Sequence, residues 1–155
     1  MLKRPELLSP AGNLTKLKIA LEYGADAVYG SVASFSLRTR SAREFNLETF
    51  KEAIDYTHEK GKKFYATINA FPFNSQIEPL KRHLQTISAM KPDAFIIATP
   101  GVMSLAKEIA PDIEIHLSTQ ANVMNVLDAK IYHDMGAKRI VVAREMNLKD
   151  VIKIK

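Results

Sequence analysis

The stretch Glu114-Ile-His-Leu-Ser-Thr-Gln-Ala-Asn122 alternates apolar and polar residues, which is the pattern of a β-strand with two different faces. One face carries Ile115, Leu117, Thr119 and Ala121, and the other carries His116, Ser118, Gln120 and Asn122. The nearby stretches Phe95–Ala98 and Ile140–Ala143 are apolar throughout, as buried parallel strands are. A polar row inside such a sheet indicates a functional site; an internal hydrogen-bonded network is the alternative that the sequence leaves open.

Outward from this stretch, one unit recurs six times along the chain: a short apolar strand followed by an amphipathic helix. The predicted strands are Glu6–Pro10, Ala27–Gly30, Phe64–Ala70, Ala94–Ala98, Ile113–Ala121 and Ile140–Ala143. The predicted helices are Leu14–Tyr23, Leu47–Lys60, Ile77–Met90, Val102–Ile109, Val126–Met135 and Leu148–Ile154. Asparagine precedes four of the helices as an N-cap, and glycine ends three of them: Asn13, Asn46, Asn125 and Asn147, then Gly24, Gly61 and Gly136.

Repeated βα units predict an α/β fold with a parallel sheet, either doubly wound or closed as a (β/α) barrel of the TIM type. The barrel is favoured because no Gly-x-Gly-x-x-Gly follows the first strand and because polar residues end nearly every strand. A barrel of this type closes with eight strands over roughly 250 residues. Six units in 155 residues therefore predict an incomplete barrel. We expect residues 1–155 to be the N-terminal part of a single barrel domain in a longer protein, with strands supplied by another chain as the weaker alternative.

The composition excludes several classes of protein. No run of 18 apolar residues is present and the start lacks a secretory h-region, so a soluble, cytoplasmic protein is expected. With no cysteine, this chain has no disulfide, no thiolate nucleophile and no cysteine-bound metal, and we assign no metal ligand in it. The net charge of +5 is compatible with a polyanionic partner, and part of it is local, at Arg38, Arg40 and Arg43.

A self-contained protease is poorly supported by these residues. His58-Glu59 begins like a zinc-protease helix, but Lys62 stands where the second histidine would be. His116 and Ser118, as base and nucleophile, are two residues apart on a strand and so roughly 6.6 Å apart. Activation of a serine requires a hydrogen bond of roughly 3 Å, and no Gly-x-Ser-x-Gly turn is present.

Several strand ends carry residues suited to binding an anion. Arg38 and Arg40 follow the second strand, and a guanidinium group binds phosphate or carboxylate with two donors. The alternative for both is a solvated loop or a structural ion pair with Glu44 or Glu48. Arg144 and Glu145 are adjacent, so only one of them can face the barrel interior. Tyr29 and Asn69 are further candidate donors, whereas Glu6 is expected near the opposite end of the barrel as an anchor. The loop aromatics Phe35, Phe45, Phe71 and Phe73 either stack on bases or plug the loops.

Five segments, in order along the chain, together resemble the N-terminal region of the U32 peptidase family: Leu8–Gly12, Gly24–Tyr29, Phe35–Arg40, His116–Asn122 and Ala143–Glu145. The Phe-Ser-Leu-Arg-x-Arg segment is most similar to the branch that contains tRNA hydroxylation proteins. The resemblance implies a collagenase-like peptidase label and an action in tRNA hydroxylation that uses the small dicarboxylate prephenate. It also implies an iron–sulfur cluster in the intact protein, with ligands outside this chain. Two minor departures are Thr99 before Pro-Gly and Met146 after Arg-Glu.

The sequence thus predicts an incomplete barrel whose site uses two groups of residues. The catalytic candidates are His116, Ser118, Gln120 and Glu145; the substrate-binding candidates are Arg38, Arg40, Tyr29, Asn69, Asn122 and Arg144. The expected partners are tRNA, a small carboxylate and a second copy held through exposed sheet edges, without a membrane. The alternatives are an inactive, self-associating fragment and a genuine protease.

Overall fold

The computed structural model describes residues 4–32, 35 and 45–155. In this part of the chain, all strands are parallel and form one six-stranded sheet in the order β1-β2-β3-β4-β5-β6. The strands are β1 (Leu8–Pro10), β2 (Ala27–Gly30), β3 (Lys63–Ile68), β4 (Ala94–Ile97), β5 (Glu114–Leu117) and β6 (Arg139–Ile140). A doubly wound sheet reverses its strand order at a switch point. The sequential order therefore confirms the barrel alternative.

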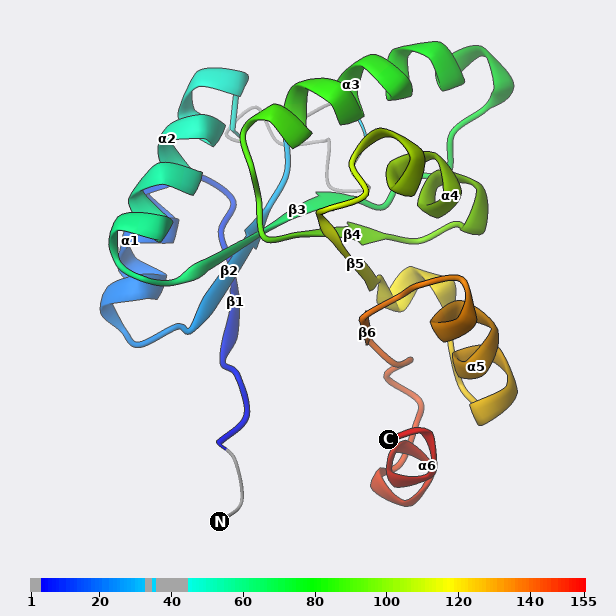
Figure 1. The fold of residues 1–155 in the computed structure, drawn as a ribbon. Coiled ribbons are helices and arrows are strands. Elements are labelled where there is room, and N and C mark those ends of the chain that lie inside the picture. Colours follow the sequence, from blue (N-terminus) through cyan, green and yellow to red (C-terminus); the bar gives the residue numbers. More distant parts are fainter. Residues whose placement is uncertain (1–3, 33–34, 36–44) are drawn as a thin grey trace.

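The helices that connect successive strands lie on the outer side of a curled half-barrel, whose open side lies between β1 and β6, and a last helix follows β6 (Figure 1). The α-helices are α1 (Leu14–Glu22), α2 (Leu47–Glu59), α3 (Ile77–Ala89), α4 (Pro100–Ile109), α5 (Val126–Asp134) and α6 (Leu148–Ile154). Two short 3-10 helices precede α3 and α5: η1 (Asn74–Gln76) and η2 (Thr119–Ala121). None of the helices in the described ranges is long and apolar enough to cross a membrane.

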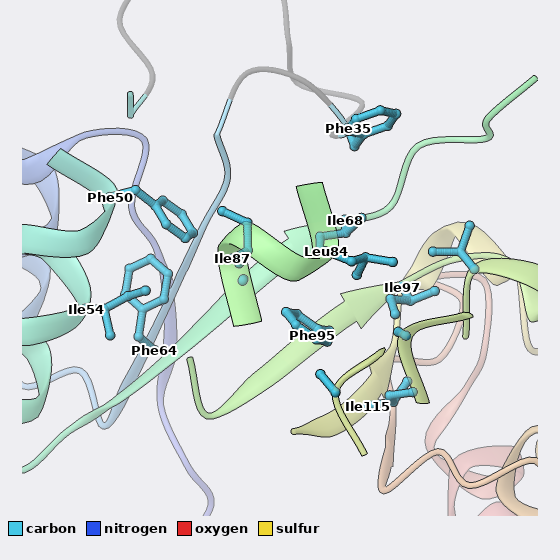
Figure 2. Packing of buried hydrophobic residues seen from close by; sticks show 14 of the residues in the cluster. Phe35, Phe50, Ile54, Phe64, Ile68, Leu84, Ile87, Phe95, Ile97 and Ile115 are labelled. Carbon is cyan, nitrogen blue, oxygen red and sulfur yellow. The ribbon is translucent and has the colours of Figure 1, made fainter. Parts of the chain in front are cut away.

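The two faces of the sheet pack differently. The convex face packs against the helices in one large apolar core, in which Phe50 and Phe64 meet edge to face with ring centroids 5.1 Å apart. Figure 2 shows Phe50, Ile54 and Phe64 facing one another between α2 and the sheet. The concave face carries a smaller buried cluster that includes Tyr65 and Ile96. Because, among the described residues, the concave face is covered by this small cluster and by no helix, there is room for a cavity on the concave side of the curled sheet.

The predicted helix caps are confirmed, although α4 begins at Pro100 instead of Val102, where Thr99 caps it. Asn13, Asn46, Asn125 and Asn147 each accept a backbone N–H in the first turn of a helix, which satisfies an orphan donor. Gly24, Gly61 and Gly136 have positive φ, as the residue that ends a helix commonly does. Asp26 and Asp93 also anchor the starts of strands, because they accept the backbone N–H of Leu7 and Phe64.

The predicted bounds of several strands need correction, most of all those of β5 and β6. β5 ends at Leu117, because Ser118 caps η2 by accepting the N–H of Gln120 and the chain then turns at Asn122, whose φ is 55°. Gln120 and Asn122 therefore do not continue the strand face of His116 and Ser118, as the sequence predicted. β6 is Arg139–Ile140 instead of Ile140–Ala143. β1 begins at Leu8 instead of Glu6, β3 spans Lys63–Ile68 instead of Phe64–Ala70, and β4 ends at Ile97 instead of Ala98.

Candidate functional site

A cavity of about 340 Å³ lies inside the curl, at the carboxyl ends of the strands. Each strand or the loop that follows it contributes to its wall, and small-molecule sites in proteins start at about this volume. The lining residues are Leu8, Ala11, Gly12, Tyr29, Gly30, Ser31, Thr67, Asn69, Ile96, Ser118, Thr119, Gln120, Val141, Val142 and Arg144. Five of the predicted site residues are among them: Tyr29, Asn69, Ser118, Gln120 and Arg144.

Ser118 is the centre of the polar wall. Its Oγ accepts a hydrogen bond from Asn69 Nδ2 at 3.4 Å and another from the backbone N–H of Gln120 at 3.3 Å. Both bonds are long, and the hydroxyl proton of Ser118 has no acceptor among the described residues. Ser118 can therefore donate this proton to a ligand that enters the cavity.

Thr67 supplies a second available hydroxyl group. Its Oγ1 is buried and, within the described part of the chain, has no hydrogen-bond partner. Buried polar atoms are nearly always paired, so an orphan in a cavity wall points to a partner that occupies the cavity. The sequence analysis missed Thr67. The signal was available, since Tyr65, Thr67 and Asn69 are spaced two apart and share the concave face of β3.

Arg144 is the charged member of the wall. Its side chain is exposed, lines the cavity and has no carboxylate within ion-pair distance among the described residues. The adjacent Glu145 is exposed and does not line the cavity, so Arg144 is the one of the pair that faces the interior. Among the described residues that line the cavity, none is an aspartate or a glutamate. The described wall thus offers one guanidinium group and several neutral donors, and none of its described residues is a carboxylate that would compete for them. Such a wall suits a small anionic ligand.

His116 lies below the cavity and is not part of its lining. The side chain is 2% exposed, its ring meets Tyr65 edge to face at 4.6 Å, and its Nε2 lies 3.3 Å from Oε2 of Glu114. Burial and the charge of Arg139 lower the pKa of His116, against the opposing effect of Glu114. The neutral imidazole thus supports the floor of the cavity. Ser118 is bonded to Asn69 and Gln120, so the described residues contain no histidine–serine nucleophile pair.

The floor itself is an ionic cluster at the amino ends of the strands. Glu6 accepts hydrogen bonds from Tyr65, at 2.9 Å, and from Arg139 of β6. Burial alone would raise the pKa of Glu6, but the hydrogen bonds from Arg139 and Tyr65 outweigh it and lower the pKa. Burial and the bond to Glu6 raise the pKa of Tyr65 to about 12. The predicted role of Glu6 as an anchor at this end is confirmed.

The remaining candidates lie elsewhere. Arg38 and Arg40 fall outside the described residues. Asn122 follows η2 in the left-handed conformation and does not line the cavity. His58, the start of the incomplete zinc motif, lies 2.9 Å from Asp93 instead of near a second histidine. Among the described residues, no group of three or more metal-ligating side chains comes together.

A curled parallel sheet with a polar cavity at the carboxyl ends of its strands is the architecture of (β/α)-barrel proteins, which assemble their sites at this end. Comparison with known sequences gives the family. The model of peptidase family U32 matches residues 12–155, and this chain belongs to that family.

The relatives of this chain include proteins named for RNA modification. The tRNA hydroxylation protein P of Helicobacter pylori is 66% identical over 150 residues, which make up 97% of this chain and 36% of that protein. The 23S rRNA 5-hydroxycytidine C2501 synthase of Escherichia coli is 34% identical, over 96% of this chain and 22% of the relative. This chain therefore spans about a third or less of the length of these two relatives.

A solved structure confirms the fold independently. The structure of the U32 peptidase Mk0906 superposes with a TM-score of 0.81 over 97% of this chain and 64% of that chain. The sequence identity is 18%, so this likeness concerns the fold alone. The resemblance that the sequence segments indicated is thus confirmed at the level of the family and of the barrel-type fold.

Proposed function

We propose that this chain forms the ligand-binding half-barrel of an enzyme or accessory factor in tRNA hydroxylation. The observation that carries the proposal is the cavity, whose described wall holds the guanidinium group of Arg144 and no carboxylate. Among the described residues, the hydroxyl protons of Thr67 and Ser118 have no acceptor and also belong to this wall. The names of the relatives support tRNA as the macromolecular substrate, and a cytoplasmic location is part of the proposal.

The ligand of the cavity is, in this proposal, a small carboxylate such as prephenate. A carboxylate pairs with Arg144 near the opening, while a hydroxyl or carbonyl oxygen of the same molecule accepts from Thr67 or Ser118 deeper in the cavity. His116, whose pKa is lowered by burial, adds no positive charge to the floor beneath. Among the described residues, recognition of the anion therefore depends chiefly on Arg144.

Replacing Arg144 by alanine in the intact protein is expected to weaken prephenate binding about tenfold or more, because a charge-assisted hydrogen bond contributes about 1.5–3 kcal/mol. Isothermal titration calorimetry with prephenate measures the change. Lys51→Ala is the matched control: it removes one positive charge from the exposed face of α2, where Lys51 pairs with Asp55, and should leave affinity unchanged.

Equal affinity of the Arg144→Ala variant and the wild type would refute the proposed role of this cavity. Thr67→Val provides a second readout in the same titration. This change removes the orphan hydroxyl group and keeps the shape, so affinity should fall several-fold while the protein becomes no less stable. A loss of stability would show that Thr67 is paired in the free protein.

An iron–sulfur cluster is part of the proposal for the intact protein, with cysteine ligands from outside this chain. The residues present do not fit such a cluster, since the chain contains no cysteine and no ligand group of three or more forms among the described residues.

A second candidate function is self-association of the 155-residue chain. The apolar side chains of Leu127 and Ile131 on α5, and of Leu148 and Ile152 on α6, are exposed beside the edge strand β6. Sedimentation velocity over a range of concentrations should show a dimer that Leu127→Glu with Ile152→Glu dissociates. Tyr23→Glu, at another exposed site, should have no effect. A monomer at every concentration would eliminate this candidate.

A further inference from the structure

Two phenylalanine side chains stand exposed on the loop between β3 and α3. Phe71 is 53% exposed and Phe73 is 76% exposed, with Pro72 between them. The other two aromatic residues that the sequence singled out behave differently, because Phe35 and Phe45 are 8% and 2% exposed and plug the loops. Packing therefore explains Phe35 and Phe45 and leaves Phe71 and Phe73 without a structural role.

The loop that carries these rings is held at both ends. The backbone N–H of Ala70 donates to the carbonyl oxygen of Phe35 at 3.1 Å, and the N–H of Phe73 donates to Oε1 of Gln76 at 2.8 Å. Pro72 restricts the backbone between the rings. Little conformational entropy is then lost when the loop binds a partner, which favours a preorganised contact surface.

The position and the charge of this surface favour a nucleic acid. Asn69, two residues before Phe71, lines the cavity, so the loop rises from the same end of the half-barrel. On α3, which follows the loop, the exposed Arg82 has no carboxylate within ion-pair distance among the described residues. The chain carries a net charge of +5. Exposed aromatic rings combined with positive charge are a typical means of binding unpaired bases.

We propose that Phe71 and Phe73 form a stacking surface for unpaired bases of the RNA substrate, beside the opening of the cavity. This inference rests on the proposed function in tRNA hydroxylation and adds where the RNA lies. A base stacked on this loop brings the neighbouring nucleotides to the carboxyl ends of the strands, where Ser118, Thr67 and Arg144 line the cavity.

The test uses the intact protein and an unmodified tRNA transcript, with the dissociation constant measured by fluorescence anisotropy at several salt concentrations. Phe71→Ala and Phe73→Ala are each expected to weaken binding about tenfold. The dependence of affinity on salt should stay the same, because the rings neutralise no phosphate. Tyr23→Ala is the matched control: Tyr23 is 86% exposed at the end of α1, which leads to the amino end of β2, and its loss should change nothing.

The outcomes separate the inference from the proposed function. If the wild-type protein binds tRNA and both variants bind it equally well, the inference alone is overturned. Phe71 and Phe73 would then be candidates for contact with a protein partner. Wild-type protein that binds no tRNA would overturn the proposed function and the inference with it. Weaker binding of both variants, with unchanged circular dichroism spectra and unchanged Tyr23→Ala affinity, would support the stacking surface.

Discussion

Gly30→Ala is expected to lower the free energy of unfolding by about 2–3 kcal/mol, at the upper end of the range for overpacking. A Cβ atom at Gly30 would lie 2.8 Å from the carbonyl oxygen of Ala11 and 2.9 Å from Cε2 of Phe45. The first neighbour is backbone and the second belongs to a buried ring, so neither can move aside cheaply. Urea denaturation followed by circular dichroism measures the loss.

Gly101→Ala is the control for this substitution. Gly101 lies in the first turn of α4, where a Cβ atom would meet nothing within 4 Å. Alanine there should leave stability unchanged or raise it by about 0.5–1 kcal/mol, because glycine is the poorer helix former. Equal losses for the two variants would mean that the close approach of Ala11 and Phe45 to β2 does not limit the size of residue 30. Because Gly30 lines the cavity, Gly30→Ala should also weaken binding of the small ligand.

Glu6→Gln should destabilise the fold by about 2 kcal/mol at neutral pH. The change removes the charge that Arg139 pairs with and leaves the guanidinium group partly buried. Loss of one partner from a fully buried pair costs about 3–5 kcal/mol. The cost here is smaller because the Arg139 side chain is 39% exposed and water screens it.

The pH dependence of this difference follows from the lowered pKa of Glu6. Its ordinary value is 4.5, and the folded value lies below it, so the folded protein favours the carboxylate. The stabilisation is complete above the unfolded pKa and is lost as the pH falls through the folded pKa. Wild type and Glu6→Gln should therefore differ fully at pH 7 and converge below pH 4.5. A constant difference between their denaturation midpoints down to low pH would contradict the ion pair as its cause. Tyr65 stays protonated throughout, because its pKa is raised to about 12.

Most of the fold could be predicted from local patterns. Helix caps at Asn46 and Asn147 and the glycine at Gly61 are local devices, and the structure confirms them. The strand ends were less predictable. Period two continues through Ser118 to Asn122, but the side chain of Ser118 accepts from the backbone of Gln120 and starts η2. A capping hydrogen bond therefore ended a strand that the alternation of residues would have continued.

The candidate site was predicted in part. The sequence shows which side chains of a strand point to the concave face of the sheet, but it does not show how far along the barrel each of them lies. His116 and Ser118 do share the concave side, as the alternation of β5 predicted. Ser118 lines the cavity, whereas His116 lies beneath it against Tyr65, a residue from a strand far earlier in the chain. Gln120 reaches the cavity from η2. The partnership of Arg139 with Glu6 has no local signal at all, since 133 positions separate them.

That separation has a consequence for how the chain folds as it leaves the ribosome. Each strand pairs with the next strand in sequence, so the sheet can grow one βα unit at a time during synthesis. The bond from Arg139 to Glu6 is the exception, since it must wait until residue 139 has emerged, 133 positions after Glu6. Contacts between residues far apart in the sequence form late, because closing a long loop costs conformational entropy before the contact itself can stabilise the fold. The floor of the half-barrel therefore closes after β1 to β5 have paired, and Glu6 stays without Arg139 while these units assemble.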